Sequence, residues 1–328
     1  MKAYSPSLFV RVAALTTIIV ASPAAAQQAA APASAATTAT CEIEQGKPQT
    51  VARAMLSLTK AQAASKGGDP TKDLKDIVAA LNAPGFKNEN PVGRAFLLAS
   101  AYVLLLDQPA IQPTMPRSAV GIATDPTSTI DLFAAADSAI TIVEQSSPGC
   151  VTYMAPFRQQ KPWLNATNAA INALNDNKLD SAEIYARRSL TLDRKSPYAY
   201  TVLASVAKAR KNYPTMLEYA RQALAAAGTD SVYADIRDRT NYDIAATMTL
   251  RAQAATGPEK KSLAKEAIKG WEPLLLTKDD VGGTTAVSNI MKMYIAAGDS
   301  LQIGKIYAPM IADPSNYAEG TLLQAGVV

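Results

Sequence analysis

One sequence unit occurs twice between residues 163 and 230, and this repeat limits the possible folds more than any other feature of the sequence. A shift that moves residue 163 onto residue 197 also places the triplet Tyr185-Ala186-Arg187 on Tyr219-Ala220-Arg221. A fixed period of this length is typical of a helical unit that is stacked on copies of itself, because each unit buries its apolar face against the next. The shift also superposes Ala170 on Ala204, Ala173 on Ala207, Leu179 on Tyr213 and Leu190 on Leu224.

Small residues recur at the same positions in both copies, although the first copy departs from the pattern by having Ala166 and Ala169 where the second has the large Tyr200 and Leu203. The second copy contains Tyr200-x2-Leu203-Ala204-x2-Ala207, the turn Asn212-Tyr213 and Met216-x3-Ala220-x2-Ala223, and the first contains Ala166-x2-Ala169-Ala170-x2-Ala173 and Ala182-x3-Ala186-x2-Ser189. This order, at a period of about 34 residues, resembles the tetratricopeptide repeat. The resemblance implies an all-α fold, a right-handed α-solenoid of antiparallel helix hairpins, with its best repeats at 163–196 and 197–230. An alanine-rich helical bundle with accidental similarity is the alternative.

Alanine occupies the positions at which the two helices of each hairpin would come closest. Two helices approach each other closely only where the side chains between them are small. We therefore expect lines of helix contact at Ala170, Ala182, Ala204 and Ala220.

Apolar residues at helical spacing extend the predicted array over residues 49–328. No segment alternates with period two, so essentially no sheet is expected. A terminal half-unit at 315–326 would cap the open end of the stack. Helices outside the two best repeats are expected near 49–66, 69–84, 90–106, 129–146, 231–255 and 257–271, and from Thr284 onwards.

Residues 107–128 interrupt this rhythm with an insertion that contains four prolines and cannot continue a helix. A segment of this length without regular structure in a compact array is either functional or disordered. Its apolar residues make it less polar than a plain linker, and we expect a flap over one face of the array that is available to a partner. The prolines are Pro109, Pro113, Pro116 and Pro126, and the apolar residues are Ile111, Met115, Val120 and Ile122.

Residues 1–26 have the layout of a secretory signal peptide, with basic residues, a short apolar run and Ala24-Ala25-Ala26 as the cleavage site. We expect cleavage after Ala26, with an uncleaved anchor as the alternative, and a flexible leader at 27–48. Loss of Lys2 and Arg11 lowers the formal net charge from +4 to +2, which gives no case for nucleic acid. The expected location is the periplasm of a Gram-negative cell, or outside it, with no transmembrane segment after cleavage.

The sequence contains two cysteines, Cys41 and Cys150. Two cysteines in an exported chain most simply form one disulfide. This disulfide would fasten the leader to the second hairpin. Lipid attachment at Cys41 and a redox-active pair are the alternatives, although no Cys-x-x-Cys motif is present.

The composition excludes most enzyme classes. Histidine is absent, which removes Ser-His and Cys-His nucleophiles and the common His-ligated zinc sites. Ser-x-x-Lys occurs at both Ser57 and Ser262, but without the Lys-Thr-Gly element that accompanies it in penicillin-binding enzymes. We expect no catalytic residues, no metal site and no cofactor, and an enzyme remains the third function class.

The candidate binding site is a stripe of four asparagines, Asn165, Asn168, Asn172 and Asn175, which share one side of a helix. A carboxamide both donates and accepts hydrogen bonds, as the backbone of an extended peptide requires. A solvated polar face is the simpler interpretation. Arg158, Arg187 or Arg221 would receive a ligand carboxylate, and Tyr200 completes the candidate set.

The resulting hypothesis is a protein- or peptide-binding scaffold of the bacterial cell envelope that binds through a concave helical groove. The family resemblance implies an interaction scaffold but no particular partner, because repeat scaffolds serve many systems. The alternative is an envelope protein that captures a small ligand or glycan on exposed tyrosines and Trp163.

Overall fold

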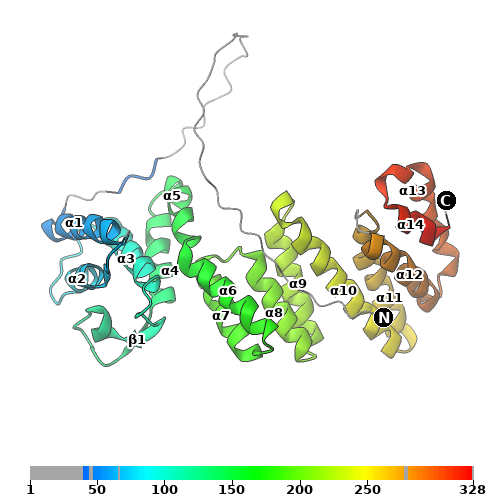
Figure 1. Ribbon diagram of the computed structural model, residues 1–328, viewed down its shortest axis with the longest axis horizontal. Helices are drawn as coiled ribbons and strands as arrows, with labels where there is room; N and C mark the ends of the chain where they lie inside the picture. Colours follow the sequence, from blue (N-terminus) through cyan, green and yellow to red (C-terminus); the bar gives the residue numbers. More distant parts are fainter. Residues whose placement is uncertain (1–39, 44–46, 66, 277–279, 327–328) are drawn as a thin grey trace, which may run out of the picture. The chain divides into compact units, whose positions relative to one another are not determined.

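The computed structural model describes residues 40–328 except 44–46, 66, 277–279 and 327–328, and this part of the chain is almost entirely helical (Figure 1). The predicted signal peptide and most of the leader at 27–48 lie outside the described residues. Among the helices described, none is both long and apolar enough to cross a membrane.

Fourteen α-helices follow one another in the described residues. In the N-terminal part they are α1 (Gln49–Ala64), α2 (Thr71–Leu81), α3 (Pro91–Leu106), α4 (Leu132–Glu144) and α5 (Pro148–Arg158). In the two best repeats they are α6 (Lys161–Asn175), α7 (Leu179–Leu192), α8 (Pro197–Ala209) and α9 (Tyr213–Ala227). The remainder are α10 (Ala234–Ala254), α11 (Gly257–Trp271), α12 (Asp280–Ala297), α13 (Gly304–Ala312) and α14 (Glu319–Ala325).

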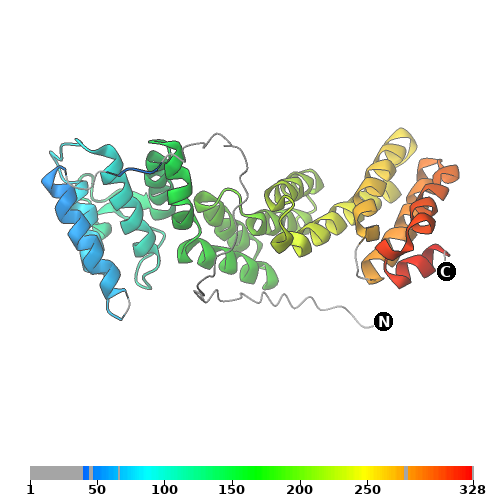
Figure 2. The same cartoon turned by 90° about the horizontal axis from the view of Figure 1, so that it is seen from above.

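Neighbouring helices pack against each other in sequence order, as Figure 1 and Figure 2 show. The main pairs are α1 with α2, α3 with α4, α6 with α7, α8 with α9, α10 with α11, and α11 with α12. A second set of contacts links alternate helices, because α8 contacts both α6 and α10, and α10 also contacts α12. The predicted all-helical fold, with neighbouring helices packed in sequence order, is therefore confirmed.

The turns inside the two best repeats have the same backbone conformation. Asn177 after α6 and Lys211 after α8 occupy equivalent positions of the two repeats, and both are left-handed, with φ of 58° and 59°. The residue that follows each of them donates a backbone hydrogen bond of 2.8 Å to a helix carbonyl, Lys178 to Ala173 and Asn212 to Ala207. This arrangement satisfies carbonyls that the helix end leaves unpaired. The repeat is thus present in the backbone as well as in the sequence.

The four alanines expected at helix contacts are buried. Ala170 and Ala182 have no exposed surface, and Ala220 and Ala204 expose 1% and 6% of theirs. Ala170 and Ala182 belong to one apolar cluster that joins α6, α7 and α8, whereas Ala204 and Ala220 belong to a cluster that extends to α13. Small side chains at these positions allow the backbones to approach.

The insertion is a folded flap. Its strands β1 (Thr114–Pro116) and β2 (Thr129–Asp131) pair antiparallel, with Met115 opposite Ile130. The expectation of essentially no sheet holds apart from this pair of three-residue strands, and α4 starts later than expected because β2 precedes it. Between the strands lies the 3₁₀ helix η1 (Arg117–Val120).

The flap packs on α2. This packing agrees with the expectation of a flap that covers one face of the helical array. Val120 is completely buried, and η1 contacts α2. Gly121 has φ 92°, and a Cβ at this position would lie 2.7 Å from the carbonyl oxygen of Lys75 in α2. Only glycine permits both this conformation and this close approach.

Helix α5 was not expected from the sequence. It carries Pro148 in its first turn and Pro156 near its end, and only Cys150 and Met154 are buried. Cys150 forms a disulfide with Cys41, 109 residues earlier, so the predicted pairing is confirmed. The disulfide therefore joins the leader to α5, which packs on α4. The sequence interpretation had expected it to join the leader to the second hairpin.

The last helix, α14, packs on α12 at a site where a glycine meets a threonine. Thr321 is completely buried, and a Cβ at Gly283 would lie 3.0 Å from the Thr321 Cβ and closer still to its hydroxyl. Gly283→Ala is therefore expected to displace α14 and to cost about 1–3 kcal/mol of local stability, as overpacking does. Hydrogen exchange of the α14 amides measures this effect. Gly304→Ala is the control, because nothing lies within 4 Å of a Cβ there, and equal protection in both variants would contradict the prediction.

Candidate functional site

The four asparagines of the predicted stripe are all exposed on α6. Their spacing of three, four and three residues places them along one side of the helix. None of their side chains makes a hydrogen bond to another described residue. We call Asn165, Asn168, Asn172 and Asn175 the asparagine stripe.

Three of the four equivalent positions in the next repeat are buried, and the fourth, Ala209, is exposed. Ala199, Val202 and Val206 in α8 are the equivalents of Asn165, Asn168 and Asn172, and they expose 0%, 3% and 2% of their surface. They belong to the apolar cluster that α8 forms with α6 and α7. This side of α8 is therefore the one by which it stacks on the preceding hairpin. The asparagine stripe occupies the equivalent side of α6.

The stacking side of α6 is uncovered because α5 interrupts the series of hairpins. The main contacts of α6 are with α7 and α8, whereas α5 packs on α4 and α3, and α4 contacts α7. An uncovered stacking face would normally expose apolar residues. On α6 it carries carboxamides, which are solvated in the absence of a partner and can still form hydrogen bonds with one.

Arg158, at the end of α5, already has two carboxylate partners in its own chain. It donates to both oxygens of Glu144 and to Oδ1 of Asp137, each at 2.7 Å, and to the carbonyl oxygen of Leu192 at 2.8 Å. Its side chain is 16% exposed. The hydrogen bonds to Glu144, followed in importance by those to Asp137, raise the pKa of Arg158 against the opposing effect of burial. Its guanidinium therefore joins α4, α5 and α7, and it is not available for the ligand carboxylate expected from the sequence.

The aromatic residues of the candidate sites also have internal contacts. The Tyr200 hydroxyl donates to the carbonyl oxygen of Arg194 at 3.1 Å. No hydrogen bond or ring contact joins Tyr200 to the asparagine stripe within the described part of the chain. Trp163 is half-buried and packs against the N-terminal apolar core. Trp163 therefore has a packing role, and the hydroxyl of Tyr200 is bonded within its own chain.

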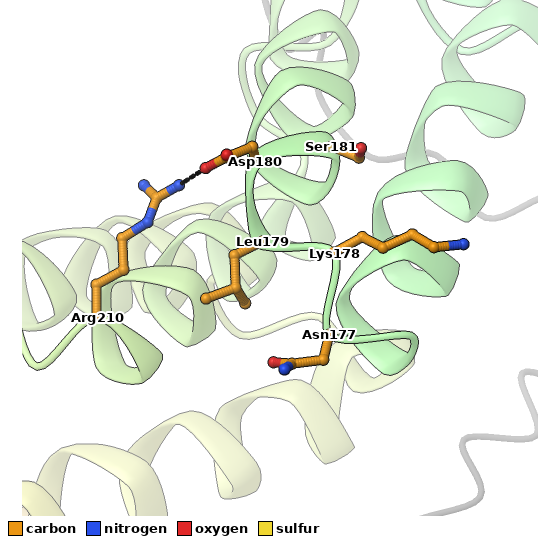
Figure 3. A pocket seen from close by; sticks show the side chains of 6 residues that line it. All are labelled: Asn177, Lys178, Leu179, Asp180, Ser181 and Arg210. Carbon is orange, nitrogen blue, oxygen red and sulfur yellow. Dashed lines mark hydrogen bonds and ion pairs between the residues drawn. The ribbon is translucent and has the colours of Figure 1, made fainter.

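A shallow hollow of about 450 Å³ begins two residues after the stripe ends (Figure 3). Arg210 pairs there with Asp180, and it also pairs with Glu183. Hydrogen bonds from Arg187 and then Arg210 lower the pKa of Glu183 below its ordinary value. Lys178 extends away from the Arg210–Asp180 pair. The hollow is lined by Asn177, Lys178, Leu179, Asp180, Ser181 and Arg210.

The sequence interpretation did not identify this hollow, because Arg210 and Asp180, which pair across it, are 30 residues apart in the sequence. The two equivalent turn positions carry different residues, Asn177 and Lys211, so the sequence holds no direct signal of their shared conformation. Among the described residues, no group of three or more acidic or cysteine side chains is placed to hold a metal ion.

A comparison with models of protein families finds no match to this chain, and a comparison with curated proteins finds none that is significantly similar.

Proposed function

We propose that this chain is a non-enzymatic scaffold of the bacterial cell envelope that binds an extended peptide segment of a partner protein along the asparagine stripe. Its helix hairpins form an α-solenoid that resembles the tetratricopeptide repeat family. The contacts between α6 and α8, between α8 and α10, and between α10 and α12 support this stacking. The disulfide supports export, because disulfides persist in oxidising compartments.

One observation carries the choice of α6 as the binding element: its stacking side is exposed and polar where the equivalent side of α8 is buried and apolar. From Asn165 to Asn175 the helix rises by about 15 Å. An extended peptide covers this distance with about four or five residues. Each carboxamide offers an acceptor and two donors, so the stripe can satisfy both groups of the peptide backbone.

The hollow next to the stripe extends the surface available to the peptide. Asn175 ends α6, and Asn177 and Lys178 line the hollow immediately afterwards. Lys178 has a side chain that is 66% exposed, and its ion pair with the exposed Asp176 is of the weak surface kind. A peptide that continues past Asn175 would therefore meet a basic side chain, which favours an acidic or carboxylate-bearing residue at that point.

The test is photo-crosslinking in living cells with the crosslinking amino acid at Asn172. Gln253 in α10 is the matched control position, because it is also an exposed carboxamide on a helix. We expect a discrete adduct at Asn172 and none at Gln253, and mass spectrometry then identifies the joined peptide. Adducts at both positions, or at neither, would contradict the proposal.

Variants of the flanking asparagines test the hydrogen bonds themselves. Asn165→Ala with Asn168→Ala, combined with the crosslinker at Asn172, is expected to reduce the adduct about fivefold or more, because each net hydrogen bond contributes about 0.5–1.5 kcal/mol. Alanine is the better helix former, so the melting temperature should not fall. A full adduct yield in this variant would show that the carboxamides do not contribute to binding.

A further inference from the structure

The two ends of the disulfide differ in their access to solvent. Cys150 has no exposed surface and lies in the N-terminal apolar cluster. Cys41 is only partly buried, and its neighbours in the sequence, Thr40 and Glu42, are both exposed. Thiol–disulfide exchange requires that a thiolate reach one of the two sulfur atoms. Of the two cysteines, only Cys41 has surface through which a thiol from solution can approach.

Two serine hydroxyls lie beside the sulfur of Cys150. The hydroxyl of Ser147 donates to Cys150 Sγ at 3.4 Å and makes no other hydrogen bond to a described residue. Ser146 Oγ lies at the same distance from Sγ, and it also donates to the carbonyl oxygen of Val143 at 2.7 Å. No side-chain donor contacts Cys41 within the described part of the chain. The environment of the two sulfur atoms is therefore as unequal as their exposure.

Ser147 directs its hydroxyl away from the usual role of a serine at its position. It is the residue before the first turn of α5, where a serine commonly accepts a hydrogen bond from a helix amide. Ser147 makes no such capping bond, and its hydroxyl donates to the sulfur instead. A disulfide sulfur is a weak acceptor, whereas a thiolate carries a full charge and accepts more strongly. This hydroxyl therefore stabilises a Cys150 thiolate more than it stabilises the intact disulfide.

The position of Cys150 in α5 acts in the same direction. Cys150 lies in the first turn of this 11-residue helix, and the positive end of a helix dipole stabilises a negative charge there. Burial opposes a charge on Cys150, and the hydroxyl donors and the helix end offset that cost. In thiol–disulfide exchange, the sulfur whose thiolate is better stabilised leaves more readily. Access and leaving-group stability thus favour attack at Cys41 and departure of Cys150.

We propose that Cys41 is a site of modification by a small thiol, which opens the disulfide in this one direction. The proton of the thiol passes to water, and the resulting thiolate attacks Sγ of Cys41. A new sulfur–sulfur bond forms there, and the bond to Cys150 breaks with its electron pair leaving on Cys150. The attacking thiol is oxidised and Cys150 is reduced, so the number of disulfide bonds does not change. The reverse attack by the Cys150 thiolate releases the thiol and restores the disulfide.

This modification would release α5 from the leader. Of the residues of α5, only Cys150 and Met154 are buried, which is fewer than in any of α1 to α4. The disulfide consequently provides a large part of the fastening of α5, and its opening acts on the least buried helix of the N-terminal part. The proposal does not depend on the function of the asparagine stripe.

The experiment treats the purified oxidised chain with 2-mercaptoethanol, a neutral thiol, and traps free thiols with N-ethylmaleimide at successive times. Peptide mass spectrometry then locates the mixed disulfide and the trapped thiol. We expect the first mixed disulfide on Cys41, with N-ethylmaleimide on Cys150. A first mixed disulfide on Cys150, equal amounts on both cysteines, or no exchange in the folded chain would overturn the proposal.

Variants of the serine beside Cys150 test the leaving group. Ser147→Ala is expected to slow formation of the Cys41 adduct about threefold or more, because it removes a donor to the departing thiolate. Ser147→Thr keeps a hydroxyl at the same position and should restore the rate. Neither variant removes a capping bond, so their melting temperatures should agree.

Ser262→Ala is the matched control, because Ser262 is an exposed serine of α11, and this variant should exchange as fast as the unmodified chain. Equal rates in Ser147→Ala and Ser262→Ala, or in Ser147→Ala and Ser147→Thr, would show that the hydroxyl does not assist departure of Cys150 and would overturn the proposed direction of exchange.

Discussion

Replacement of both cysteines, Cys41→Ala with Cys150→Ala, is expected to lower the free energy of unfolding of the N-terminal helices by about 4–5 kcal/mol, the chain-entropy value for a closed loop of about a hundred residues. The disulfide joins residues that are 109 positions apart, and the loop between them includes all of α1 to α4. Cys150 has no exposed surface and belongs to the N-terminal apolar cluster. Loss of the disulfide therefore destabilises this N-terminal cluster more than it destabilises the cluster around α10 to α12.

Urea unfolding combined with hydrogen exchange measures this effect helix by helix, because stacked repeats need not unfold as one unit. The unmodified chain under reducing conditions is the control, since it loses the disulfide but keeps both side chains. We expect lost protection in α1 to α5 and little change in α10 to α12. Alkylation of both cysteines in protein isolated from cells without prior reduction would show that the disulfide is absent in the cell.

The repeat in the sequence was sufficient to predict α6 to α9 and the contacts among them. Ala170 and Ala220 are buried as expected, because only small side chains fit where two helices approach each other closely. Helix α5 was missed for the opposite reason: with only Cys150 and Met154 buried, it has no apolar period to detect. The strands β1 and β2 are three residues each, which is too short for a period of two to be visible.

The residues of the candidate site could be predicted from the sequence, but the packing of the helices around them could not. The spacing of the asparagines predicts one exposed side of α6, and the structure places all four there. A comparison with α8 is needed to identify this side as a stacking face. Val202 and Val206 are the equivalents of Asn168 and Asn172, and both are buried. The role of Arg158 had no local signal, because its partners lie 14, 21 and 34 residues away in the sequence.

The interruption at α5 links these observations. A regular array would have stacked another hairpin on α6, and the asparagine stripe would then have been buried and unpaired, at a cost for each carboxamide. The chain instead turns aside at Pro148 into α5, which the disulfide fastens to the leader. Arg158 then holds the end of α5 against the neighbouring helices, because it binds α4 on one side and the end of α7 on the other.

Arg158→Met is accordingly expected to destabilise the junction between α5 and α6 by about 3 kcal/mol, because it leaves Glu144 as an unpaired, largely buried charge and leaves Asp137 with Arg194 alone. Asp137 and Glu144 are only 14% and 17% exposed, so water replaces the lost guanidinium poorly. Arg158→Lys should not restore stability, since an ammonium group cannot make the two parallel bonds to Glu144. Chemical denaturation of the variants measures the loss.

The control for this prediction is Arg194→Met, which removes a second guanidinium from Asp137. Arg194 is 66% exposed, and an exposed ion pair contributes less than about 1 kcal/mol. Addition of Glu144→Gln to Arg158→Met should recover part of the stability, because it removes the charge that Arg158→Met leaves unpaired. Equally small losses of stability in Arg158→Met and Arg194→Met would show that the guanidinium of Arg158 does not hold α5 in place. The exposure of the stacking face of α6 would then depend on the turn at residues 159–160 alone.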